Sequence, residues 1–258
     1  MRKLRKVHVA ALLALAGGAV FIAIAARSQS RDALRYIVQD ECVPHWQQEK
    51  NPSPCDSVVV SEMPREFDGY ALLPDIRGGA HFLLIPVTTI SGIESPQLLQ
   101  PQAINYFALA WQARDRLTAR LGHGAPREDI GLAVNSRQHR SQDQLHIHIE
   151  CLSATTYAGL QQAADHLSAH EWTPIELAKS QYAATRVMGE DLASTNPFML
   201  LAKSVPEAAQ DMGSFTLLVA GMQFRDGPGF AMVAGKDVPG AESLLDPACR
   251  VGNRAASH

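Results

Sequence analysis

The chain has 258 residues, of which 46% are hydrophobic and 19% are charged, and its formal net charge is −3. This composition is ordinary for a globular protein and long enough for a substantial core. A slightly acidic chain is a poor general binder of polyanions, so nucleic acid is not expected as a partner.

The N-terminus carries a cluster of basic residues followed by a largely apolar run at 7–26. A run of about 20 apolar residues is long enough to cross a bilayer. Because basic residues remain on the cytoplasmic side, everything after the run is predicted to be exported. We therefore expect residues 1–27 to anchor the chain in a membrane, with the rest of the chain outside the cytoplasm at the membrane face. A cleaved signal peptide is the alternative, because small residues end the run.

Four cysteines are present, at Cys42, Cys55, Cys151 and Cys249. An even number in an exported chain indicates disulfides. Cys42 and Cys55 bracket a short polar loop that a local bridge would close, which would leave Cys151 to pair with Cys249. Four cysteines allow three connectivities, so the pairing stays open at this point.

The elements before the middle of the chain follow from periodicity and turn residues. Residues 31–42 are predicted to form a helix, and two strands at 69–74 and 81–85 flank a Gly-Gly turn as a hairpin. Residues 101–121 have apolar side chains at helical spacing between Pro101 and Gly122, which predicts a helix. A strand is expected at 130–135.

The next predicted strand, 144–150, is the most informative segment of the chain. Strict alternation places Gln144, His146, His148 and Glu150 on one face and only apolar residues on the other. Two imidazoles that face a cleft have three explanations: a partly buried histidine pair, a metal site with Glu150 as an oxygen ligand, or a nucleophilic histidine with polar neighbours.

The loop before this strand, 136–143, carries Arg137, His139 and Arg140. Cations beside a histidine pair are suited to neutralising a bound phosphate. Without that neighbouring strand, a solvated loop would be the preferred interpretation.

After Cys151 we expect helices at 156–170 and 174–193 and a second apolar hairpin with strands at 215–220 and 230–234. His166 and His170 have helical spacing and are interpreted as surface histidines rather than as metal ligands.

The order of elements resembles the histidine triad (HIT) superfamily. The shared features are a hairpin whose second strand ends in Ile-Pro (81–86), a helix, a strand ending in Leu-Ala-Val-Asn (132–135) and a histidine strand. The resemblance implies an α+β fold with a HIT-like antiparallel sheet and packed helices, to which this chain adds an N-terminal transmembrane helix and a C-terminal α/β extension. The expected parts are a membrane anchor or uncleaved signal (1–27), a helix with a cysteine-containing loop (28–67), a HIT-like catalytic core (68–155) and a helical and hairpin extension (156–258).

A closer resemblance spans nearly the whole chain and is to the bacterial CDP-diacylglycerol pyrophosphatase family. It is carried by Asn-Pro-Ser-Pro-Cys (51–55), Leu-Ala-Trp-Gln-Ala-Arg-Asp (109–115), Asn-Ser-Arg (135–137), His-Ile-His-Ile followed by Cys (146–151), Asn-Pro-Phe-Met (196–199), Val-Pro-Glu-Ala (205–208) and Met-Gly-Ser (212–214). The resemblance implies hydrolysis of CDP-diacylglycerol to CMP and phosphatidate, through a nucleotidyl-histidine intermediate. It also implies a single-pass protein of the bacterial inner membrane, with its catalytic domain on the periplasmic side. The lipid substrate and the membrane are the expected partners.

This sequence departs from the HIT pattern at two positions. The triad begins with Gln144 instead of histidine, and Thr89 stands where many HIT proteins have a histidine. A register anchored on Cys151 makes His146 the nucleophile, whereas a shift of two residues would give that role to His148.

The family register implies a set of site residues. The catalytic candidates are His146, His148 and Gln144, and the substrate-binding candidates are Asn135, Arg137 and Arg140. No metal and no cofactor are expected, and the oligomeric state is left undetermined. Two other functions stay open: hydrolysis of a soluble nucleotide by a HIT-type enzyme, and a noncatalytic module that binds a nucleotide or a metal ion.

Overall fold

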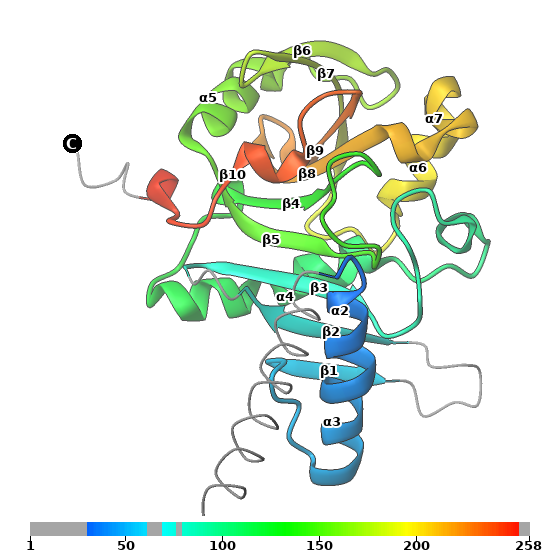
Figure 1. Ribbon diagram of the computed structural model, residues 1–258. Helices are drawn as coiled ribbons and strands as arrows, with labels where there is room; N and C mark the ends of the chain where they lie inside the picture. The colour runs from blue at the N-terminus through cyan, green and yellow to red at the C-terminus, as the bar shows by residue number, and fades with distance from the viewer. Residues whose placement is uncertain (1–29, 61–68, 76–78, 253–258) are drawn as a thin grey trace, which may run out of the picture.

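The computed structural model describes residues 30–60, 69–75 and 79–252, and its centre is one antiparallel sheet of ten strands (Figure 1). The strands are β1 (Ser57–Val60), β2 (Gly69–Pro74), β3 (His81–Pro86), β4 (Ile130–Val134), β5 (Ile147–Leu152), β6 (Thr173–Leu177), β7 (Ser180–Met188), β8 (Phe215–Phe224), β9 (Gly227–Lys236) and β10 (Leu245–Asp246). Their order is β1-β2-β3-β5-β4-β8-β9-β7-β6, and β10 pairs with β5 outside this path.

The helical segments are short apart from one. They are α2 (Ala33–Tyr36), η1 (Ile37–Cys42), α3 (Val43–Glu49), η2 (Pro96–Leu99), α4 (Tyr106–Leu121), η3 (Arg127–Asp129), α5 (Ala154–Ala163), η4 (Ala164–His166), α6 (Pro197–Ser204), α7 (Pro206–Gln210), η5 (Met212–Ser214) and η6 (Ala241–Leu244).

One face of the sheet packs against the long helix α4. Asn105 caps this helix by accepting a hydrogen bond from the Ala108 amide, and Gly122 ends it with a positive φ of 74°. Its buried side chains, including Phe107 and Trp111, join apolar residues that alternate along β3, β5, β4, β8 and β9 in the largest core cluster. The predicted helix and its C-terminal glycine are therefore confirmed, although the helix begins at Tyr106 and not at Pro101.

The opposite face carries two separate apolar clusters. Helices α2 and α3 cover one of them, over β1 to β3, as the blue ribbon in Figure 1 shows. The second cluster involves α5 and η6 and lies over β4, β8, β9 and β7. Between them, β3 and β5 present polar side chains on this face, and this polar gap is the setting of the candidate site.

Both predicted hairpins are confirmed, by β2 with β3 and by β8 with β9. The cysteine pairing is confirmed as well, with bridges Cys42–Cys55 and Cys151–Cys249. The second bridge ties the end of β5 to the turn after β10.

The predicted fold class is wrong. In the part of the chain that the structure describes, one large antiparallel sheet of ten strands with few helices stands in place of the expected HIT-like core and C-terminal α/β extension. β4 pairs directly with β8, so the sheet runs without interruption from residues of the first half into residues of the second.

The predicted helix at 174–193 is also wrong, because this segment forms the hairpin of β6 and β7. Its turn is Ala178-Lys179, and both residues have positive φ. Neither residue is a usual signal for such a turn. Strand β9 supplies hydrogen-bond partners to β7 over six residue pairs, and this long-range pairing outweighs the helical preference of an alanine-rich segment.

The predicted single-pass localisation in the inner membrane is not supported. Within residues 30–60, 69–75 and 79–252, no helix is both long enough and apolar enough to cross a membrane. The segment on which that prediction rested, 7–26, lies outside the described residues.

Candidate active site

Three imidazole rings form a row across β3 and β5. His81 lies opposite Glu150 in the antiparallel register, and His148 lies opposite Leu83. The ring centroids of His81 and His148 are 5.2 Å apart, and those of His148 and His146 are 5.1 Å apart. All three rings are buried, as is Glu150. The structure therefore brings together the histidine pair of the motif strand and a third histidine from the neighbouring strand.

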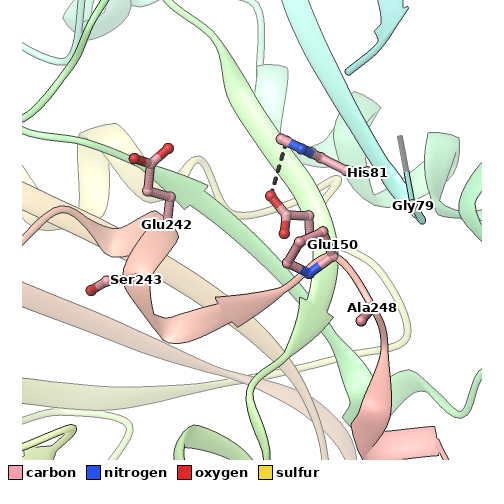
Figure 2. A pocket seen from close by; sticks show the side chains of 7 residues that line it. Gly79, His81, Glu150, Glu242, Ser243 and Ala248 are labelled. Carbon is pink, nitrogen blue, oxygen red and sulfur yellow. Dashed lines mark ion pairs between the residues drawn. The ribbon is translucent and has the colours of Figure 1, made fainter. Parts of the chain in front are cut away.

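At one end of the row, His81 and His148 meet a carboxylate. Nε2 of His81 is 2.9 Å from Oε1 of Glu150 and 3.1 Å from Nδ1 of His148. Figure 2 shows the His81 and Glu150 side chains pointing toward one another. Burial acts to raise the pKa of Glu150, but hydrogen bonds from His148 and His81 outweigh it and hold that pKa below its ordinary value. These three side chains are the group within the described residues that has the donor atoms and spacing to hold a metal ion.

Each of these two histidines has a second carboxylate near its other nitrogen. Nδ1 of His81 is 3.3 Å from Oδ2 of Asp75, and Nε2 of His148 is 3.3 Å from Oε2 of Glu242. The Glu242 oxygen is within ion-pair distance of Nε2 of His148 but does not have hydrogen-bond geometry. Nε2 of His148 is buried and makes no hydrogen bond to any described group.

At the other end of the row, His146 has a fixed orientation. Its Nδ1 is 2.7 Å from the carbonyl oxygen of Gln144, and since a carbonyl can only accept, the proton lies on Nδ1. Nε2 therefore carries the lone pair. Burial, with a further contribution from His148, lowers the pKa of His146 from 6.5 to about 3. The ring is a neutral imidazole with a free nitrogen lone pair at neutral pH.

Residues 144–146 precede the strand instead of forming its start, because β5 begins at Ile147. The side chain of Gln144 is turned to the backbone of the loop after β3, where its amide nitrogen donates to the carbonyls of Pro86 and Thr88 at 2.9 and 2.8 Å. Gln144 thus fixes the loop beside His146, and both protons of its amide group are already engaged.

The predicted cation Arg140 is buried and held between two carboxylates. Its Nη1 donates to Glu94 at 2.7 Å and its Nε donates to Asp143 at 3.0 Å. Arg31 also donates to Asp143, and mainly this hydrogen bond lowers the pKa of Asp143 to about 2. The charge of Arg140 is close enough to contribute to the lowered pKa of His146.

The two remaining predicted residues, Arg137 and Asn135, contact elements outside the row. Arg137 is half exposed and donates to Asp211 at 2.6 Å. Asn135 follows β4 and is buried, and its side-chain oxygen accepts a hydrogen bond from the Glu242 amide at 3.2 Å. Asn135 thereby positions η6, the element that brings Glu242 to His148.

A cavity of about 480 Å³ opens beside the row (Figure 2). Its lining is Gly79, His81, Glu150, Glu242, Ser243, Pro247 and Ala248. It is thus bounded by the histidine–carboxylate end of the row on one side and by η6 and the turn after β10 on the other.

Sequence reasoning missed three participants: His81, Asp75 and Glu242. His81 was placed in its strand, but its role depends on the register between β3 and β5, two strands separated in sequence by α4 and β4. The available signal was a single histidine at the start of an otherwise apolar strand. Glu242 belongs to a short helical turn that carries no motif.

The buried row of imidazoles beside a cavity defines a site with the groups that covalent catalysis or metal binding requires. A model of the CDP-diacylglycerol pyrophosphatase family matches residues 29–253, and the chain belongs to this family. The protein is accordingly a hydrolase, and the family supports hydrolysis of CDP-diacylglycerol.

The lowered pKa of His146 makes folding stability depend on pH. The unfolded chain takes up a proton near pH 6.5, whereas the folded ring stays neutral down to about pH 3. The contribution of the neutral His146 ring to folding stability is therefore fully present above pH 6.5. It is lost as the pH falls toward the folded pKa, by up to about 1.4 kcal/mol per pH unit.

We expect His146→Asn, which keeps a side-chain N–H for the Gln144 carbonyl, to lose less unfolding free energy than the wild type between pH 6.5 and pH 4. Urea unfolding of both proteins across this range measures how steeply the unfolding free energy of each changes with pH. Equal dependence on pH in the two proteins would contradict the lowered pKa of His146.

Proposed function

We propose that His146 is the nucleophile in the hydrolysis of CDP-diacylglycerol and that the reaction passes through a cytidylyl-histidine. The observation that supports this role is the hydrogen bond from Nδ1 of His146 to the Gln144 carbonyl. It fixes the tautomer in which Nε2 is unprotonated, and the low pKa keeps that nitrogen available at neutral pH.

In the first step, Nε2 of His146 attacks the phosphorus that bears cytidine. The N–P bond forms, the bond from that phosphorus to the bridging oxygen breaks, and the bond's electron pair leaves on phosphatidate. In the second step, the oxygen of a water molecule bonds to the same phosphorus, the N–P bond breaks, and CMP is released. One proton of the water stays on the new phosphate oxygen of CMP and the other passes to the solvent. His146 regains its lone pair, so the histidine is regenerated without any other reactant.

His148 is the proposed donor to the developing charge on oxygen. Its Nε2 is buried and has no hydrogen-bond partner among the described groups, so a substrate oxygen would satisfy it. A donor fixed in this way typically lowers the barrier by about 3 kcal/mol. His148 fits the nucleophile's role less well, because Nδ1 is in contact with His81 and Nε2 faces Glu242.

The other site residues have supporting roles in this proposal. Gln144 orients His146 through its backbone carbonyl and the adjacent loop through its side chain. Arg140 adds positive charge near the reacting phosphates, and Arg137 and Asn135 border the nucleotide's path. Arg137 is the most exposed of these three, so its ion pair with Asp211 can exchange for a phosphate at small cost.

Hydrolysis in ¹⁸O-labelled water tests which phosphorus is attacked. Detergent micelles of CDP-diacylglycerol are incubated with the protein, and CMP and phosphatidate are both analysed by mass spectrometry. We expect equal amounts of the two products and the label in the phosphate of CMP. Label in phosphatidate would contradict attack on the cytidine-bearing phosphorus.

Parallel reactions with soluble pyrophosphate-linked nucleotides test the substrate class. A clear preference for the lipid is expected. Faster hydrolysis of a soluble nucleotide would replace the proposal by the soluble-substrate alternative, and binding of both substrates without turnover would indicate a noncatalytic module.

A further inference from the structure

Where His81, His148 and Glu150 meet, more nitrogen and oxygen lone pairs face one another than there are protons to form hydrogen bonds between them. A neutral imidazole has one N–H and one lone pair. A neutral His81 has one proton for two carboxylate contacts. On Nε2 the proton satisfies Glu150, 2.9 Å away, and leaves a lone pair facing Asp75; on Nδ1 it satisfies Asp75 and leaves a lone pair facing Oε1 of Glu150 and Nδ1 of His148. A proton on Nδ1 of His148 can lie along only one of its two contacts. One further positive charge among these three atoms would resolve the conflict.

We propose that His81, Glu150 and His148 form a site for a divalent transition-metal ion, with Zn²⁺ as the best fit. The donor atoms Nε2 of His81, Nδ1 of His148 and Oε1 of Glu150 are separated by 3.1, 2.9 and 3.7 Å. A tetrahedral Zn²⁺ ion with bonds of about 2.0–2.1 Å separates its ligand atoms by about 3.4 Å. The three atoms therefore already have the spacing of one face of a coordination tetrahedron.

The surroundings of the two histidines agree with metal binding. Histidine ligands usually direct their second nitrogen to a carboxylate, which fixes the tautomer and orients the ring. His81 has Asp75 in this position, at 3.3 Å; Glu242 lies 3.3 Å from the second nitrogen of His148, but without hydrogen-bond geometry. All three ligand residues are buried, so their donors are shielded from competing water.

The nature of the ligands selects the class of ion. Two imidazoles and one carboxylate suit Zn²⁺ and related transition metals, whereas Mg²⁺ and Ca²⁺ prefer oxygen ligands. Because His81 and Glu150 also line the cavity, the fourth position opens toward it and would take an oxygen atom from water or a phosphate.

One consequence of metal binding rests on the proposed function. An ion on Nδ1 of His148 leaves its proton on Nε2, which is the nitrogen that the proposed reaction uses as a donor. The metal would therefore hold His148 in its donating tautomer beside the nucleophile, while His146 itself is not a ligand.

Isothermal titration of chelator-treated protein with Zn²⁺ tests the site without reference to turnover. We expect one ion per chain, no comparable binding of Mg²⁺, and a loss of Zn²⁺ affinity of more than about 100-fold in Glu150→Gln, beyond the 10–100-fold typical when an outer partner is lost. Asp75→Asn should fall within that smaller range. The matched control is the double variant His166→Gln/His170→Gln, which removes two exposed histidines and should bind like the wild type.

Unchanged affinity in Glu150→Gln, or loss of binding in the His166/His170 control, would overturn the proposal. So would an absence of one-to-one binding to the wild type. If Glu150→Gln does not fold, the visible spectrum of Co²⁺ bound to the wild type decides: four-coordinate absorption supports the site, and a six-coordinate spectrum contradicts it. Each readout is independent of turnover, so failure of the metal site and failure of the His146 mechanism are distinguishable.

Discussion

His146→Asn is expected to lower kcat for CDP-diacylglycerol hydrolysis by on the order of 10⁶-fold, because the variant has no nucleophile and loss of a nucleophile can cost about this much. Asparagine can still donate a hydrogen bond to the Gln144 carbonyl, so the loop should retain its position. The expected pattern is loss of kcat with KM changed little, since His146 forms its bond to phosphorus only during the reaction.

His148→Asn is the matched comparison, because it alters the adjacent ring of the same row. It should lower kcat by about 10²–10³-fold, as expected for removal of one charge-stabilising donor. Product formation over time, measured with both variants at saturating lipid, separates the two roles. If His148→Asn has the larger effect, the nucleophile is His148 and the alternative register of the motif applies.

The Cys151–Cys249 bridge is expected to make the larger disulfide contribution to stability. It closes a loop of 98 residues, whereas Cys42–Cys55 closes one of 13. On the chain-entropy account, the first bridge contributes about 4.7 kcal/mol and the second about 3 kcal/mol. We expect Cys151→Ala/Cys249→Ala to lose more unfolding free energy than Cys42→Ala/Cys55→Ala.

Urea unfolding of the two double variants and the wild type measures this difference. All four cysteines are buried, so alanine leaves comparable small apolar groups at both bridges. A larger loss in the Cys42/Cys55 variant would contradict the expected order. The Cys151–Cys249 bridge also adjoins the site, because Pro247 and Ala248 before Cys249 line the cavity.

The local parts of the fold were predictable because their signals are local. The turn containing Gly79 lies between two apolar runs, and Gly122 marks the end of α4. The hairpin of β6 and β7 was not predictable in this way. Its turn at Ala178 and Lys179 uses left-handed backbone without glycine, and its pairing with β9 depends on residues about 50 positions away.

Only the part of the candidate site that lies on the motif strand was predictable from the sequence. Alternation around His146 and His148 correctly placed both rings on the same side, but it could not supply the neighbours that determine their chemistry. The pattern indicates Glu150 as a possible ligand, but His81 reaches Glu150 through the pairing of β3 with β5, and Glu242 reaches His148 from η6, which is distant in the sequence. The low pKa of His146 is likewise a property of burial, which appears only once the sheet and its covering loops are in place.

The most direct test of the nucleophile is to identify the residue that carries CMP during turnover. The protein is mixed briefly with CDP-diacylglycerol labelled in the cytidine-bearing phosphate and quenched in alkali, because phosphorus–nitrogen bonds of histidine survive base better than acid. The chain is then digested and its labelled peptides are sequenced by mass spectrometry. A cytidylyl group on His146, absent from His146→Asn, is the predicted result; a cytidylyl group on His148 or on any other residue would contradict the account.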